Sequence, residues 1–112
     1  MSVLAQRHLI PPTASISFTR ELGPQWRSYK YSALFPQAWT TVEYVVIHEP
    51  VWWNQQPNTD KTVYQWYREF LDRSAAFELL YVSGTDRIYR RIPGSQLEPV
   101  PAEYLPGTYT FY

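Results

Sequence analysis

Apolar and polar residues alternate along several short stretches of the chain, and a period of two is typical of β-strands that are buried on one face. Ile16 and Phe18 alternate with polar residues after Ala14, and a second alternation runs from Trp26 to Tyr31. Gly23-Pro24 lies between these stretches and supplies turn-forming residues. We therefore predict a β-hairpin, in which the chain returns antiparallel to its first strand.

The same pattern predicts a second hairpin between Phe77 and Ile92. Leu79 and Tyr81 continue the alternation that starts at Phe77, and the turn-forming run SGTD occupies positions 83–86. Ile88, Tyr89 and Ile92 then provide apolar positions for the returning strand.

A central strand is predicted over residues 40–48, with the sequence TTVEYVVIH. This stretch is rich in β-branched and aromatic residues, and its Val45-Val46-Ile47 run suits a strand that is buried on both faces.

The spacing of apolar residues changes to a helical period after Thr59 and Asp60, either of which can serve as the N-cap. The apolar positions predicted to face the core are Val63, Trp66, Tyr67, Phe70 and Leu71, and the polar positions opposite them are Lys61, Gln65, Arg68, Glu69 and Asp72. We predict one main amphipathic helix with Trp66 and Phe70 inaccessible to solvent.

These elements predict an α+β fold, with a small, mostly antiparallel β-sheet of two hairpins plus a central strand packed on one main α-helix. The predicted organisation is an N-terminal arm over residues 1–13, a single core domain over residues 14–94, and a C-terminal arm or terminal strand over residues 95–112. Pro11-Pro12 enforces extension at one end, and Pro99, Pro101 and Pro106 do so at the other.

Composition points to protein contacts rather than to polyanions or membranes. The 112-residue chain has no formal net charge and no cysteine, and aromatic residues make up 18% of it, as do charged residues. A core of this size is not expected to hide every ring, and Tyr and Trp are enriched at protein interfaces. The predicted interface residues are Trp52, Trp53, Tyr109, Phe111 and Tyr112. Other protein subunits, in a homo- or hetero-oligomer, are therefore the expected partners.

The chain shows no recognised catalytic, metal or cofactor motif, so we predict a protein that is not an enzyme and has no cofactor. His48 and Glu49 are adjacent, and adjacent residues of a strand face apart. His8 and His48 lack any zinc-ligand spacing, and the glycines are too dispersed to cradle a phosphate. We also expect no membrane span, because no apolar run is long enough, and no signal peptide at residues 1–10.

An alternative function is nucleic-acid binding through the second predicted hairpin, where Arg87, Arg90 and Arg91 surround Tyr89. Arginines can pair with phosphates while an aromatic ring stacks on a base. Because the chain has no net charge, a solvated strand face with local carboxylate partners is the preferred interpretation, and nucleic acid is not an expected partner.

The predicted order of elements is a first hairpin, an aromatic-faced helix that contains VYQWYREFL (63–71), and a second hairpin that contains FELLYVSGTDRIYRRI (77–92). This order resembles small structural proteins from the tails and necks of tailed bacteriophages. The resemblance is architectural, and it implies an oligomeric ring or hub subunit whose extended arms bridge its neighbours. We therefore expect a non-enzymatic structural or assembly protein, located in the virion if the protein is viral and in the cytoplasm otherwise.

Overall fold

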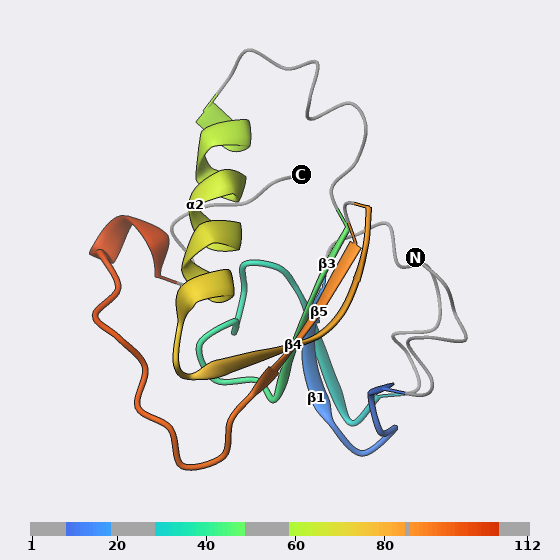
Figure 1. Cartoon of the computed structure of the whole chain (residues 1–112). Helices are drawn as coiled ribbons and strands as arrows, with labels where there is room; N and C mark the ends of the chain where they lie inside the picture. The colour runs from blue at the N-terminus through green and yellow to red at the C-terminus, as the bar shows by residue number, and fades with distance from the viewer. Residues whose placement is uncertain (1–8, 19–28, 49–58, 85, 106–112) are drawn as a thin grey trace.

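A mixed five-stranded sheet with the strand order β2-β1-β3-β5-β4 forms the framework of the protein, and a helix packs on one of its faces (Figure 1). The computed structural model describes residues 9–18, 29–48, 59–84 and 86–105. The elements in chain order are β1 (Ser15–Phe18), β2 (Tyr31–Leu34), β3 (Tyr44–His48), α2 (Thr59–Arg73), β4 (Phe77–Ser83), β5 (Asp86–Arg91) and the short 3₁₀ helix η3 (Ala102–Tyr104). The predicted α+β class is therefore confirmed.

Strand β3 occupies the middle of the sheet, as predicted for the Val-Val-Ile run. Val45 and Ile47 belong to the hydrophobic cluster on the helix side, and Tyr44 and Val46 belong to the cluster on the opposite face. All four side chains are buried, which explains why this strand lacks an apolar–polar alternation. The strand starts at Tyr44, four residues later than predicted.

The prediction of an antiparallel first hairpin is wrong. Strand β1 was predicted correctly, but β2 begins only at Tyr31 and runs parallel to β1, and β1 also pairs parallel with β3. The sheet therefore combines two parallel with two antiparallel pairings and is not mostly antiparallel. Parallel neighbours need a connection of about a dozen residues, and the end of β1 at Phe18 and the start of β2 at Tyr31 are far enough apart in the sequence to allow one. Alternation in a sequence reports which residues share a face and carries no information about strand direction.

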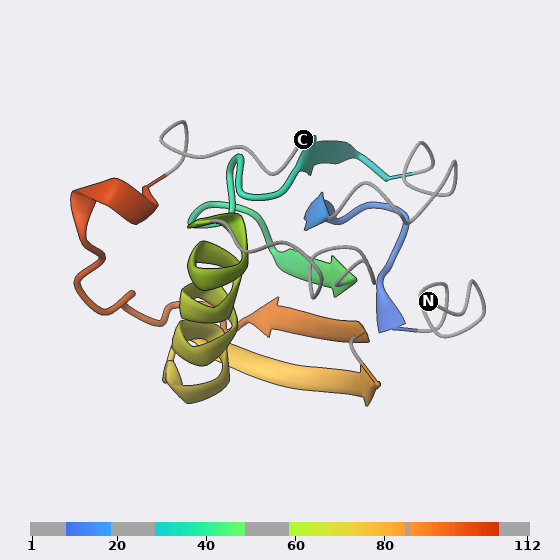
Figure 2. The same ribbon diagram turned by 90° about the horizontal axis from the view of Figure 1, so that it is seen from above.

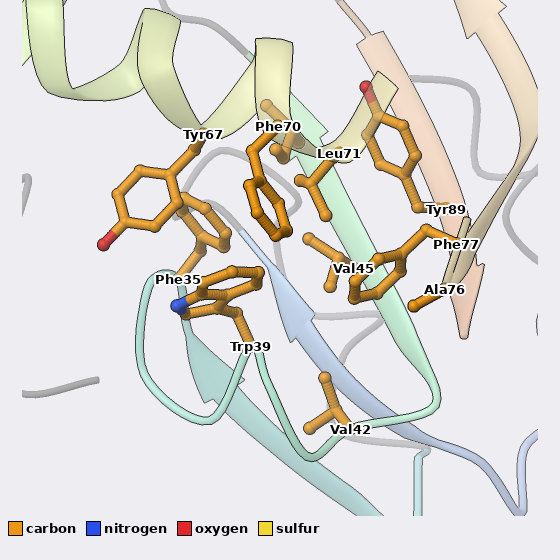
Figure 3. Close-up of a cluster of buried hydrophobic side chains, with 11 residues drawn as sticks. Phe35, Trp39, Val42, Val45, Tyr67, Phe70, Leu71, Ala76, Phe77 and Tyr89 are labelled. Atoms are coloured by element: carbon orange, nitrogen blue, oxygen red, sulfur yellow. The ribbon is translucent and has the colours of Figure 1, made fainter. Parts of the chain in front are cut away.

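Helix α2 confirms the helical prediction, and its apolar stripe packs against the sheet (Figure 3). Tyr67, Phe70 and Leu71 are buried, whereas Glu69 and Asp72 are exposed. Trp66 differs from its prediction because it is only half-buried and packs at the border of the cluster.

Strands β4 and β5 form the second predicted hairpin, and a β-bulge near Leu80 shifts their register. Leu79 lies opposite Tyr89, but Tyr81 lies opposite Ile88, so β4 uses one residue more than β5. The predicted alternation through Phe77, Leu79 and Tyr81 is therefore broken. Phe77 is buried and Leu79 is exposed, while Tyr81 packs against the cluster on the other face.

The core on the helix side is predominantly aromatic (Figure 3). The Trp39 ring meets Tyr67 edge-on at 5.5 Å between centroids and Phe70 at 5.6 Å, and it stacks against Phe77 at 6.4 Å. Such edge-to-face and offset pairs add stability beyond the apolar area that they bury. Trp39 is completely buried and anchors the 35–42 turn under the helix.

Residues 92–105 cross from the end of β5 to the side of the helix, as Figure 2 shows from above. Within this segment, which we name the strap, Leu97, Val100 and Tyr104 pack against the helix-side cluster. The described part of the predicted C-terminal arm thus covers its own domain, and residues 106–112 lie outside the described residues.

The N-terminal arm behaves similarly where it is described. Ile10 is 1% exposed and belongs with Ala14, Ile16 and other residues to the cluster on the face opposite the helix, and Leu9 packs against this cluster. Leu9 and Ile10 therefore obtain their apolar contacts within the domain.

Candidate protein–protein interface

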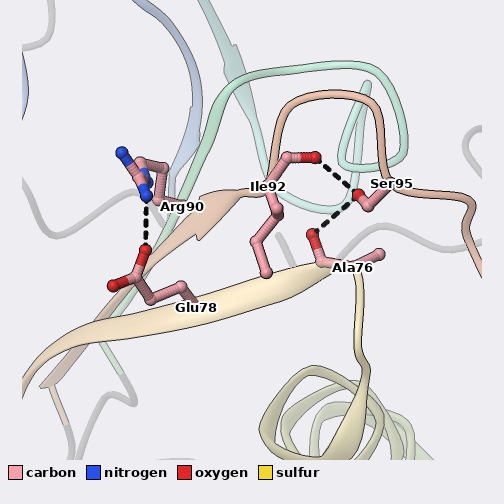
Figure 4. Close-up of polar contacts among 5 residues, drawn as sticks. All are labelled: Ala76, Glu78, Arg90, Ile92 and Ser95. Atoms are coloured by element: carbon pink, nitrogen blue, oxygen red, sulfur yellow. Dashed lines mark hydrogen bonds and ion pairs between the residues drawn. The ribbon is translucent and has the colours of Figure 1, made fainter.

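The arginines of the predicted nucleic-acid hairpin are divided between the two faces of β5. Arg90 Nη2 donates to Glu78 Oε2 at 2.6 Å across the hairpin (Figure 4). Arg87 lies on the helix face, where its Nε is 3.7 Å from Asp72 Oδ1 at the end of α2. Alternation along the strand keeps Arg87 and Arg90 on opposite faces, so they do not form one basic surface.

Tyr89 is fully buried and has no exposed ring on which a base could stack. Its hydroxyl donates to Asp72 Oδ1 at 2.5 Å, which satisfies the polar tip of a ring whose body lies in the helix-side cluster. Asp72 therefore receives the Tyr89 hydroxyl and also lies close to the Arg87 guanidinium.

Arg91 has a structural role at the junction of the strap with the sheet. Its Nη1 donates to the Thr40 carbonyl at 2.9 Å, and its Nε donates to Ser95 Oγ at 3.2 Å. The guanidinium also lies over the Phe77 ring, 5.5 Å from the centroid. Arg91 is thus held by protein groups on several sides and is not presented to a phosphate.

Ser95 completes this junction by lying close to two backbone carbonyls (Figure 4). Its Oγ is 2.6 Å from the Ile92 oxygen and 3.3 Å from the Ala76 oxygen, and Ile92 N–H donates to Ala76 O at 2.8 Å. Hydrogen bonds to Ile92 and Ala76 therefore hold the start of the strap against the sheet.

The carboxylates of the described residues are used separately. Glu43 accepts from the Ser15 amide at 3.1 Å, Glu78 accepts from Arg90, and Glu98 accepts from Ser74 Oγ and from the Ala75 amide. These bonds to Ser74 and Ala75 hold the pKa of Glu98 below its ordinary value of 4.5. No cluster of His, Asp and Glu within this part of the chain could hold a metal ion.

All five predicted interface residues, Trp52, Trp53, Tyr109, Phe111 and Tyr112, lie outside the described residues, as do His8 and Glu49. Among the described aromatic side chains, those that are buried are Phe18, Phe35, Trp39, Tyr44, Tyr67, Phe70, Phe77 and Tyr89. Tyr31 is exposed, and the Tyr64 side chain lies outside what the structure describes. Many of the aromatic residues that led to the interface prediction are therefore buried in the core.

The outer edge of β4 presents a surface that the sequence did not predict. This strand is the last one in the sheet order, and Leu79 and Val82 on it are 45% and 53% exposed. Their partners across the hairpin, Tyr89 and Arg87, share the helix face, so Leu79 and Val82 also lie on that face. An exposed apolar pair on an edge strand is typical of sites where another strand adds to a sheet.

The β-bulge explains why alternation did not reveal this pair. Positions 79 and 82 would lie on opposite faces of a regular strand, and the extra residue brings them to the same face. No residue type in the sequence marks the position of the bulge.

Comparisons with known proteins identify no family for this chain. No family model matches the chain, no curated protein matches its sequence, and no solved structure matches it significantly. Within the described ranges, no helix has the length and apolar character that crossing a membrane requires.

Proposed function

We propose that this protein is a non-enzymatic assembly protein that acts through contacts with other protein subunits. The finer proposal, carried over from the predicted order of elements, is a structural protein of a phage tail or neck; the first hairpin of that order is not formed, because β1 and β2 are parallel. The observation that carries the proposal is the outer edge of β4, which pairs with no other strand among the described residues and where Leu79 and Val82 expose apolar surface. Natural proteins usually protect such edges with charges or cover them, because edges recruit other chains.

The neutral net charge and the internal pairing of the arginines also support this function over nucleic-acid binding. Arg90 is neutralised by Glu78, Arg91 is enclosed by Thr40, Ser95 and Phe77, and Tyr89 is buried. Phosphate contacts dominate nucleic-acid affinity. Arg90 and Arg91, which would have to contact phosphates, already pair with protein groups. We expect generic DNA or RNA to bind weakly at physiological salt, as measured by fluorescence anisotropy.

Light scattering coupled to size-exclusion chromatography tests the proposed function directly. We expect the mass of the chain to rise above 13.3 kDa towards a multiple of it as its concentration increases from low micromolar to near millimolar. A constant mass of 13.3 kDa across that range would refute self-association of the chain, the homo-oligomeric form of the proposal. Tight, salt-dependent nucleic-acid binding that an Arg90→Ala variant abolishes would favour the alternative instead.

A further inference from the structure

We propose that the β4 edge binds the β4 edge of a second copy of this chain, antiparallel, about a two-fold axis that passes between Leu80 and Tyr81. This inference rests on the proposed function, because it assigns the surface through which the assembly forms. The pairing would join the two sheets into one continuous sheet with both α2 helices on the same side.

The backbone directions on β5 establish which residues of β4 face outwards. Ile92 N–H donates to Ala76 O at 2.8 Å, whereas Arg91 N–H donates to Glu43 O at 2.7 Å, next to β3. Backbone groups alternate in direction along an antiparallel ladder. Even-numbered residues of β5 therefore bond towards β4, and odd-numbered residues bond towards β3.

The register then transfers this alternation to β4. Leu79 lies opposite Tyr89 and Val82 lies opposite Arg87, and both of these β5 residues bond towards β3. The peptide groups of Leu79 and Val82 consequently point to the outer edge. The residues whose backbone groups face the outer edge, away from every strand that the structure describes, are thus the same residues that expose apolar side chains.

Leu79 and Val82 can pair with each other across a two-fold axis between two copies of the chain. When Leu79 of one copy pairs with Val82 of the second, two-fold symmetry pairs Val82 of the first with Leu79 of the second. The same register places Leu80 opposite Tyr81 and Glu78 opposite Ser83, so no like charges lie opposite each other. Apolar residues face apolar residues on both sides of the joined sheet.

The bulge favours a second copy over an unrelated regular strand. β4 takes three steps from Leu79 to Val82, whereas the regular strand β5 takes two steps from Tyr89 to Arg87. Two copies of β4 contain the same extra residue at the same place, so none is left opposite a gap. The absence of net charge also removes long-range repulsion between identical chains.

Engineered cysteines test this register, and the chain supplies a cysteine-free background. Glu78→Cys and Ser83→Cys are made as separate proteins, one of them carrying a size tag, and are mixed under mild oxidation. The proposed pairing brings positions 78 and 83 together as a non-hydrogen-bonded pair with Cα atoms about 4.5 Å apart, within disulfide range. Two cysteines at position 78 would be about 16 Å apart, since each residue of a strand spans about 3.3 Å.

A charge substitution with a matched control tests the edge independently. Val82→Lys places an ammonium group in the pairing edge, and Tyr31→Lys places one on β2 at the opposite edge of the sheet, where the side chain is also 53% exposed. We expect Val82→Lys to raise the dimer dissociation constant by about tenfold or more and Tyr31→Lys to leave it nearly unchanged. Circular dichroism checks that both variants still unfold cooperatively.

The outcomes separate this inference from the proposed function. Rapid cross-linking of the 78–83 mixture, with none in either single variant, supports the pairing. A concentration-dependent mass without that cross-link, or with equal effects of Val82→Lys and Tyr31→Lys, refutes the β4 pairing and leaves the proposed function intact. A constant monomer mass refutes the β4 pairing together with any homo-oligomer of the chain.

Discussion

Replacement of Tyr104 by alanine tests whether the strap is an integral part of the domain. The Tyr104 ring stacks on Trp66 with centroids 3.9 Å apart and planes at 3°, and it meets Tyr67 edge-on at 5.7 Å. The Tyr104 carbonyl also accepts hydrogen bonds from Trp39 Nε1 at 3.1 Å and from the Tyr67 hydroxyl at 2.8 Å. Tyr104→Ala removes the ring and keeps this carbonyl.

The expected loss follows from the ring contacts. An aromatic pair contributes about 0.5–1.5 kcal/mol beyond its buried area, and Tyr104 makes one stacked and one edge-on pair. Half of the benefit of burying a large side chain adds about 1 kcal/mol. We therefore expect the free energy of unfolding to fall by about 2–4 kcal/mol, which lowers the melting temperature by about 8–16 °C in a domain of this size.

Thermal and urea unfolding, followed by circular dichroism, measure this loss. The control is Leu105→Ala, because Leu105 is the next residue, is 40% exposed and should cost less than about 0.5 kcal/mol. A double-mutant cycle with Trp66→Ala should give a coupling of about 0.5–1.5 kcal/mol. Equal stability of the Tyr104→Ala and Leu105→Ala variants would refute the reasoning, since the strap would then contribute nothing to the core.

Further predictions concern polar contacts and backbone conformation. Arg91→Ala should lower the free energy of unfolding by about 2 kcal/mol, because it leaves the Thr40 carbonyl without its charged donor. Arg90→Ala removes an exposed ion pair and should lower it by less than about 1 kcal/mol. Equal losses of the two variants in urea unfolding would contradict this prediction. Ala38 has a positive φ of 59°, so Ala38→Gly should leave the melting temperature nearly unchanged, and Ala38→Val should cost about 2 kcal/mol. Because the pKa of Glu98 is lower in the folded state, its carboxylate stabilises the fold fully above pH 4.5, and this stabilisation is lost as the pH falls through the folded pKa. Glu98→Gln should therefore reduce the pH dependence of the free energy of unfolding at acid pH. An unchanged pH dependence would exclude this contribution.

The sequence predicts best those elements whose apolar spacing matches the face that they bury in the structure. The helical spacing of Tyr67, Phe70 and Leu71 identified the buried face of α2, and the Val-Val-Ile run identified the central strand. The hairpin of β4 and β5 followed from alternation around a Gly-containing turn. In each case local spacing and burial on a neighbouring layer give the same answer.

Features that depend on strand direction or on one extra residue were not predictable in this way. The alternation at Ile16 and Phe18 is the same for a parallel and an antiparallel neighbour, so the pairing of β1 with β2 was predicted incorrectly. The bulge near Leu80 has no residue signature, and it moves Leu79 and Val82 onto one exposed face. The helix-side packing of Leu97 and Val100 depends on distant residues that local periodicity does not report.

The candidate site shows a different limit. Alternation along β5 already separates Arg90 from Arg87 and Tyr89, so a period-two analysis of the arginine cluster would have placed these residues on two faces. Tyr89 is buried in the helix-side cluster, whose other members are distant in the sequence, and Asp72 at the end of α2 accepts its hydroxyl. These residues were interpreted as one surface because they are close in the sequence, whereas the fold places them on two faces of β5.

Strand β3 has consequences for how the chain emerges from the ribosome. It pairs with β1 on one edge and with β5 on the other, and its pairing partners on β5 are synthesised about forty residues after β3 itself. Until β5 appears, the nascent chain carries the Val45-Val46-Ile47 run with one open strand edge, a combination that favours aggregation. The β4–β5 hairpin and α2 rely on nearby residues and fold quickly, so synthesis of the C-terminal half closes an edge that the N-terminal half leaves exposed.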